Sequence, residues 1–223
     1  MDVKLFGRAL VKFLSGVLLL GLLLFLPAGT LRWPQGWRLM GILFIPMFVA
    51  GLIMMKWSPA LLRKRLEARE EQSEQKTVIA LSGIMFLAAF IVAGLNFRFG
   101  WIPLPRWVSW AAAAVFLAAY GLYAEVLRDN VWLSRTIEVQ ENQRVVDTGL
   151  YSIVRHPMYM STLLLFLSMP LVLGSVLSFG IMLAYIPIIA KRIRNEEKVL
   201  EAGLAGYAEY KKRVRYKAIP FVW

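Results

Sequence analysis

The sequence contains no cysteine and a single histidine, His156. The absence of thiols excludes a disulfide framework, a thiolate nucleophile and a cysteine-ligated zinc site. One histidine also excludes a metal site built from several imidazoles, so we expect no metal. Charged residues are scarce, at 18% of the chain, whereas hydrophobic residues make up 59% and the mean hydropathy is +0.59. This composition is too apolar for a soluble domain and predicts an integral membrane protein.

Four long apolar runs have the length that a membrane-spanning helix requires. Each contains close to the ~20 residues that cross a hydrocarbon core of about 30 Å. The runs cover residues 9–26, 39–55, 78–95 and 107–127. Lys4 and Arg8 before the first run also fit a secretory signal, but the length of the run and the spans that follow at short intervals favour a membrane helix.

A second apolar region, residues 158–190, follows a polar stretch and is interrupted by Pro170 and by Gly174 with Ser175. As one helix it would extend about 50 Å at 1.5 Å per residue, which exceeds the bilayer thickness. We therefore expect a hairpin with arms of about 15 residues each, because such a break relieves the mismatch. The predicted fold is an all-α, polytopic membrane bundle of four spanning helices, a C-terminal helical hairpin and a cytosolic tail.

The net charge of +12 is explained by this topology. With the N-terminus in the cytosol and a hairpin at 158–190, all but four of the 26 Lys and Arg residues lie in cytosolic segments. A single crossing would divide the basic residues equally between the two sides. The positive-inside rule therefore favours the hairpin, with both termini in the cytosol. Since the membrane accounts for the charge, we expect no nucleic-acid partner.

Aromatic residues and a charged loop fit the same topology. The two short outer loops contain four tryptophans, which we interpret as interfacial anchors: Trp33, Trp37, Trp101 and Trp107. On the opposite side, residues 58–76 begin with a Ser-Pro pair and read as an interfacial helix.

His156 lies in the polar segment that leads into the hairpin, within the sequence GLYSIVRHPMY at 149–159. Pro157 is suited to the first position of a helix, which places His156 at the N-cap. Unpaired backbone N–H groups and the positive end of the helix dipole favour an anion there. Taken by itself, however, the His-Pro pair is equally well explained as a capping turn.

Two charged residues that follow the hairpin favour a functional interpretation. In KRIRNEEKVL, Arg192 and Glu196 are four residues apart and therefore share one face of a helix. They emerge at the cytosolic foot of the hairpin, close to His156. A guanidinium, a carboxylate and an imidazole at the mouth of an apolar cavity form a suitable site for an amphipathic substrate. We interpret the neighbouring Glu197 as an interfacial charge.

These motifs together resemble the isoprenylcysteine carboxyl methyltransferase family and its bacterial relatives. The match rests on GLYSIVRHPMY, on RIRNEEKVL and on GYAEYKKRV followed by an aromatic residue and a proline, and it covers roughly residues 135–223. It divides the chain into four transmembrane helices, 1–127, and a catalytic region, 128–223, with a cofactor loop, the hairpin and a cytosolic helix and tail. We expect an integral protein of a bacterial inner membrane whose active site faces the cytosol.

The resemblance implies a methyltransferase that depends on S-adenosyl-L-methionine. It assigns catalytic roles to Arg192, Glu196 and His156, with Arg192 as the substrate-binding arginine. The implied cofactor contacts are Gln143, Arg144, Val145, Val146, Tyr151, His156, Pro157, Met158, Tyr159 and Glu196. The implied partners are membrane lipids and a lipophilic or lipidated acceptor, such as a prenylated cysteine.

A carboxylate acceptor needs no general base, because the cofactor's sulfonium is already a good leaving group. The protein must then supply alignment and exclusion of water. We expect the acceptor's lipid tail to arrive from the bilayer between the fourth span and the hairpin, and the cofactor to arrive from the cytosol.

Three other functions stay open at this level. Sterol-type membrane reductases, which use NADPH, carry a motif similar to RHP-x-Y. A phospholipid amine N-methyltransferase would need Glu196, Glu197 or His156 as a base to deprotonate the ammonium. A non-enzymatic scaffold would bind no cofactor.

Overall fold

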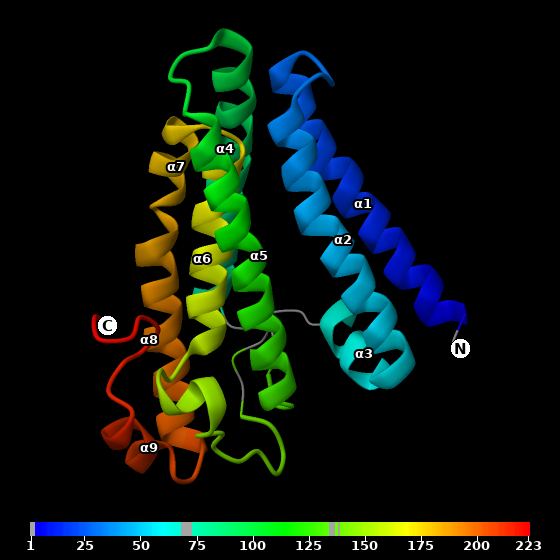
Figure 1. Ribbon diagram of the computed structural model, residues 1–223. Helices are drawn as coiled ribbons and strands as arrows, with labels where there is room; N and C mark the ends of the chain where they lie inside the picture. Colours follow the sequence, from blue (N-terminus) through cyan, green and yellow to red (C-terminus); the bar gives the residue numbers. More distant parts are fainter. Residues whose placement is uncertain (1–2, 68–72, 134–136, 138) are drawn as a thin grey trace.

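The computed structural model describes residues 3–67, 73–133, 137 and 139–223, which form a bundle of helices (Figure 1). In chain order these are α1 (Val3–Ala28), α2 (Pro34–Trp57), α3 (Pro59–Glu67), α4 (Ser73–Phe99), α5 (Arg106–Asp129), the 3₁₀ turn η1 (Gly149–Ser152), α6 (Pro157–Val172), α7 (Val176–Met182), α8 (Tyr185–Gly203) and α9 (Tyr207–Arg213). Within these described residues there is no extended strand, only isolated bridges. The predicted all-α class is confirmed.

Five helical segments of the described chain are long and apolar enough to cross a membrane. They are Lys4–Ala28, Pro34–Trp57, Thr77–Phe99, Arg106–Asp129 and Val176–Gly203. The first four contain the four predicted apolar runs and extend beyond each run at both ends. Many large apolar side chains on these helices are exposed, as is expected of surfaces that face lipid. The protein is therefore an integral membrane protein.

The apolar region after His156 folds back on itself, because α6 runs in the direction opposite to α7 and α8 (Figure 1). Residues 173–175 make the turn, with Gly174 at a φ of 78° and the Ser175 hydroxyl accepting the Ser178 N–H at 3.2 Å. The α6 helix has 16 residues, but the return segment has 28 because α8 continues without a break into the charged sequence KRIRNEEKVL. Whether residues 158–190 form the predicted membrane hairpin with arms of about 15 residues each stays a prediction. The number of membrane crossings in this region stays a prediction.

The polar segments gather at one end of the bundle. In Figure 1 the N-terminus, α3, the segment before α6 and α9 all lie at the lower end. The short connections between α1 and α2, α4 and α5, and α6 and α7 lie at the upper end, where Pro103 and Ser175 form a bridge. This arrangement agrees with the predicted sidedness, and the cytosolic location of the polar end stays a prediction.

An apolar core joins α1, α2, α4, α5 and α6. Gly94 allows α4 to approach α1 closely, since a Cβ at this position would lie 2.8 Å from the carbonyl oxygen of Leu24. Trp33 is fully buried in this core, and its ring stacks on Phe97 with the centroids 5.0 Å apart. The interpretation of Trp33 as an interfacial anchor is therefore wrong, whereas the other three tryptophans are exposed.

The α5 and α6 helices pack against each other along much of their length. Small side chains of α5, among them Ala112, Ala113 and Ala119, are buried in the core that both helices share. The Ser109 hydroxyl donates to the carbonyl of Val172 at the upper end of this contact. A lipid route between the fourth span and the hairpin would therefore have to avoid this contact between α5 and α6.

Candidate cofactor and acceptor site

The motif residues line one cavity at the polar end of the bundle. The cavity has a volume of about 90 Å³, which is smaller than the roughly 300–1,000 Å³ that small-molecule pockets usually occupy. The predicted residues that line it are Gln143, Arg144, Val145, Val146, Tyr151, His156, Met158, Tyr159, Arg192 and Glu196. Pro157 is the one predicted contact that does not line it, because it is fully buried as the first residue of α6.

His156 occupies the N-cap of α6, as its position before Pro157 predicts. Its backbone N–H donates to the carbonyl of Lys217 at 2.7 Å, and its side chain is 4% exposed. The imidazole Nε2 lies 3.3 Å from Glu197 Oε1, and Nδ1 lies 3.9 Å from Glu196 Oε1. The ring is therefore held between two carboxylates at the edge of the cavity.

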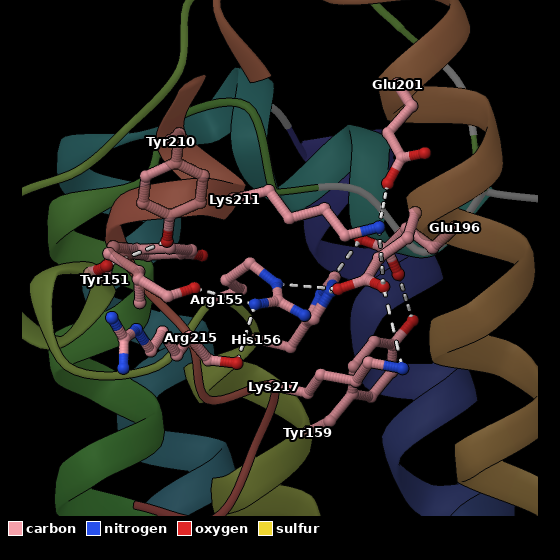
Figure 2. Close-up of polar contacts among 12 residues, drawn as sticks. Tyr151, Arg155, His156, Tyr159, Glu196, Glu201, Tyr210, Lys211, Arg215 and Lys217 are labelled. Atoms are coloured by element: carbon pink, nitrogen blue, oxygen red, sulfur yellow. Dashed lines mark hydrogen bonds and ion pairs between the residues drawn. The ribbon is translucent and has the colours of Figure 1, made fainter. Parts of the chain in front are cut away.

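Tyr159 connects the two charged residues that the sequence places on one face of α8. Its phenol donates to Glu196 and accepts the Nε–H of Arg192 at 3.1 Å. Tyr159 lies in the first turn of α6, so this bridge joins the two feet of the folded-back segment (Figure 2). The structure thus brings His156, Arg192 and Glu196 together, and their roles stay predictions.

Glu197 lies at the centre of a buried ion-pair network. The residue is 5% exposed, and its Oε1 accepts the Nε–H of Arg155 at 2.7 Å. Its Oε2 lies 3.7 Å from Lys217 Nζ and 3.9 Å from Lys211 Nζ. A buried carboxylate needs such compensation to stay charged. The interpretation of Glu197 as an interfacial charge is therefore wrong.

Arg155 connects α8 to the C-terminal segment 214–217. Its Nη1 donates to the carbonyls of Val214 and Arg215 at 2.7 and 2.8 Å, and Figure 2 shows the contact with Arg215. Its backbone N–H donates to the carbonyl of Tyr216 at 2.9 Å. Together with the hydrogen bond from His156 to Lys217, these contacts attach residues 214–217 to Arg155 and His156, which line the cavity. The sequence motifs did not predict a role for Arg155, and the one available signal was its position directly before the histidine.

Three tyrosines outside the apolar helices line the cavity. The Tyr151 hydroxyl accepts from Asn130 at 2.8 Å, and the Tyr210 hydroxyl donates to the Tyr151 carbonyl at 2.8 Å (Figure 2). The hydroxyl of Tyr207 is buried and has no hydrogen-bond partner among the described residues. A buried polar group without a partner costs about 1–3 kcal/mol, so this hydroxyl requires an explanation.

Burial raises the pKa of Tyr151, Tyr207 and Tyr210 above the ordinary value of 10.0. At Tyr207 the negative charges of Glu197 and Glu196 raise the pKa further. All three phenols are therefore protonated at neutral pH, and each has a proton to donate.

The loop before η1 forms another wall of the cavity, and η1 itself begins at a position that requires glycine. Gly149 has a φ of 56°, and a Cβ there would lie 2.3 Å from Asp129 Oδ2. Nearby, the Gln143 side chain accepts the N–H of Gln140 at 2.8 Å, while the Gln143 N–H donates to the Gln140 carbonyl at 3.1 Å. The backbone conformation of Gly149 thus starts η1, which positions Tyr151.

A separate hollow, here called the apolar groove, lies between α1, α2, α3 and α5. Its lining includes Phe6, Phe13, Phe48, Gly51, Tyr123 and Leu127. Leu127 is less than one turn before Asn130, which lines the polar cavity. The end of α5 therefore borders both the groove and the cavity.

Comparisons with known proteins agree with the motifs. Residues 108–202 match the family model described as the isoprenylcysteine carboxyl methyltransferase family. Over 91 residues, 40% of this chain, the sequence is 31% identical to a Delta(14)-sterol reductase of Mus musculus, and the match covers 22% of that protein. The structure of the eukaryotic intramembrane Ras methyltransferase, an isoprenylcysteine carboxyl methyltransferase, aligns with a TM-score of 0.58 at 21% identity, over 92% of this chain and 74% of that chain.

Proposed function

Because residues 108–202 match the isoprenylcysteine carboxyl methyltransferase family model, we propose that the chain belongs to this family and transfers a methyl group from S-adenosylmethionine to a lipophilic acceptor in the membrane. The preferred acceptor group is a carboxylate, as in a prenylated cysteine. The observation that carries the proposal is a single cavity in which His156, Tyr159, Arg192 and Glu196 meet.

The cavity fits the cofactor chemically. Glu196 offers a carboxylate for the cofactor's ammonium, and such a charge-assisted contact is among the stronger hydrogen bonds in proteins. Val145 and Trp132 line the same cavity and provide apolar surface for an adenine ring. Tyr207 also lines this cavity, and its buried hydroxyl has no hydrogen-bond partner among the residues that the structure describes. When bound, the cofactor supplies a methyl group on a positively charged sulfur.

Arg192 is suited to bind the acceptor. A guanidinium can hold a carboxylate through two parallel hydrogen bonds, which fixes the direction of the acceptor oxygen. Arg192 and Glu196 are about one helical turn, or 5.4 Å, apart along α8. The Tyr159 hydroxyl contacts both side chains and fixes their positions relative to each other. Acceptor and cofactor would thus be aligned by neighbouring groups on one rigid helix, which is the main requirement when no proton needs to be removed.

The buried network argues for a carboxylate acceptor over an amine. A phospholipid amine would need a base to remove a proton before transfer. Glu197 is paired with Arg155 at 2.7 Å and is withdrawn from that role. His156 is held by the same carboxylate at 3.3 Å, which favours a positioning role for the ring.

The apolar groove is the place that we assign to the acceptor's lipid chain. The α5 and α6 helices pack against each other along much of their length, whereas the groove is lined by apolar side chains and ends beside the last turn of α5. An acceptor with its chain in the groove would need to pass its polar head around this turn to reach Arg192.

Binding measurements with the purified protein in lipid nanodiscs test the proposal. We expect binding of S-adenosylhomocysteine and no binding of NADPH, followed by transfer of a labelled methyl group to a lipophilic product when membrane lipid extract is added. Binding of NADPH alone would support a reductase, in line with the partial match to the sterol enzyme. Binding of neither compound would support a scaffold.

Two variants make this test specific. Replacing Arg192 with Lys keeps the positive charge but removes the planar fork, so we expect S-adenosylhomocysteine to bind normally while methyl transfer falls. Replacing the exposed, lipid-facing Trp110 with Phe serves as the control and should leave both measurements unchanged.

A further inference from the structure

Tyr207 carries an unused hydroxyl in the wall of the cofactor cavity. The residue is the first of α9, follows Gly206 at a φ of 83° and is 3% exposed. Its side chain lines the cavity, yet its oxygen has no hydrogen-bond partner within the described part of the chain. Phenylalanine would fill the same space without an unpaired polar atom, so the hydroxyl is explained by a partner that the described residues do not supply.

Tyr210 provides the contrast within the same short helix. Its ring centroid lies 5.8 Å from that of Tyr207, and it lines the same cavity. Its hydroxyl, however, donates to the Tyr151 carbonyl at 2.8 Å. One of two neighbouring phenols is therefore a structural donor, and the other is left for a ligand.

The charges around Tyr207 indicate which ligand group it meets. The negative charges of Glu197 and Glu196 raise the pKa of the phenol, and the positive charge of Arg155 lowers it. Glu197 is already compensated by Arg155, which leaves Glu196 for the cofactor's ammonium. The ammonium and the α-carboxylate of an amino acid are attached to the same carbon. When Glu196 binds the ammonium, the carboxylate therefore lies close to Glu196. Because both groups are negative, the carboxylate needs a hydrogen-bond donor that carries no negative charge. A protonated phenol meets that requirement.

We propose that the Tyr207 hydroxyl donates a hydrogen bond to the α-carboxylate of S-adenosylmethionine while Glu196 holds the ammonium. This inference rests on the proposed function, because it assumes that the cavity binds this cofactor. It adds the tail motif GYAEYKKRV to the cofactor site through its first tyrosine.

The test compares two ligands that differ only in the carboxylate, S-adenosylmethionine and decarboxylated S-adenosylmethionine, without acceptor. For Tyr207→Phe we expect the affinity for S-adenosylmethionine to fall roughly tenfold or more, the loss typical of a hydrogen bond to a charged group. The affinity for the decarboxylated compound should stay the same. Melting of the ligand-free variant in detergent should occur at the wild-type temperature or above, since no internal hydrogen bond is lost.

Tyr210→Phe is the matched control. It removes a hydroxyl that bonds to the protein, so we expect a lower melting temperature and no change in the ratio of the two affinities. Equal losses for both ligands in Tyr207→Phe, or no loss for either, would overturn the inference while leaving the proposed function intact. A ligand-free Tyr207→Phe protein that melts well below wild type would also overturn it. Failure of the wild-type protein to bind S-adenosylmethionine would instead overturn the proposed function and the inference with it.

Discussion

The first two helices and the last four are stabilised in different ways. Large apolar side chains of α1, such as Leu18 and Leu26, are 65% and 69% exposed and face lipid. In the C-terminal region, Arg155, His156 and Glu197 are each close to 5% exposed and depend on specific partners. Lipid-facing helices tolerate changes of shape, whereas a buried charge tolerates few changes of partner. Substitutions among the buried charges should therefore lower folding stability and ligand binding more than substitutions on lipid-facing surfaces.

The largest effect is expected from Arg155→Ala. This change leaves Glu197 buried without its closest cation and frees the segment 214–217. Removal of one member of a buried ion pair costs about 3–5 kcal/mol of folding stability. We expect a large fall in melting temperature in detergent and loss of S-adenosylhomocysteine binding.

Arg128→Ala is the control for this prediction. Arg128 pairs with Glu125 at the surface, and its side chain is 74% exposed. Exposed pairs contribute about 0–1 kcal/mol, so melting should change little. Equal destabilisation by the two substitutions would contradict the contrast between buried and exposed charges.

The second effect is expected from Glu196→Gln, which removes the proposed partner of the cofactor's ammonium. Loss of one charged hydrogen bond lowers affinity by roughly ten- to a hundredfold. Melting should fall less than for Arg155→Ala, because Glu196 is only partly buried, with 24% of its side chain exposed. Isothermal titration with S-adenosylhomocysteine measures the affinity, and Glu201→Gln, at a pair exposed on both sides, should leave it unchanged.

The third effect concerns the backbone at Gly149. Alanine there would adopt a φ of 56° and place its Cβ against Asp129, so we expect a loss of more than about 1 kcal/mol of stability. Gly121→Ala in the middle of α5 meets no atom within 4 Å and should be neutral or stabilising. Thermal melting of both variants checks the prediction, which fails if Gly149→Ala is as stable as Gly121→Ala.

The smallest effect is expected in the apolar groove. Gly51→Phe adds a ring to the groove, where a Cβ at this position meets no atom within 4 Å. Melting and S-adenosylhomocysteine binding should not change, but the KM for a lipid acceptor should rise a few-fold. Gly83→Phe, on α4 away from the groove, is the control and should leave the KM unchanged. A KM that responds equally to both changes would place the lipid elsewhere.

Local sequence patterns predicted the helices well. Apolar length identifies the first four spans, and Gly174 with Ser175 marks the turn after α6. Pro157 fixes the start of α6, because a proline at the first helical position leaves no donor unpaired. These features depend on residues that are neighbours in the chain.

Contacts between distant segments were not predictable in the same way. Arg155 and Glu197 are 42 residues apart, and their pairing follows from how α8 returns beside the start of α6. The burial of Trp33 and the close packing of α5 on α6 are also tertiary outcomes. Nothing in a single sequence distinguishes Tyr207 from Tyr210, although one hydroxyl is bonded and the other is not.

The attachment of residues 214–217 to Arg155 and His156 has a consequence for biosynthesis. The carbonyls that Arg155 and His156 bind come after α9 in the chain, so they leave the ribosome later than the helices that line the cavity. Membrane insertion of the helices can therefore be complete before Arg155 and His156, which line the cavity, have bound their C-terminal partners. A cleavage after α9 would leave a fully inserted protein whose site never forms, and its abundance in the membrane would not report its activity.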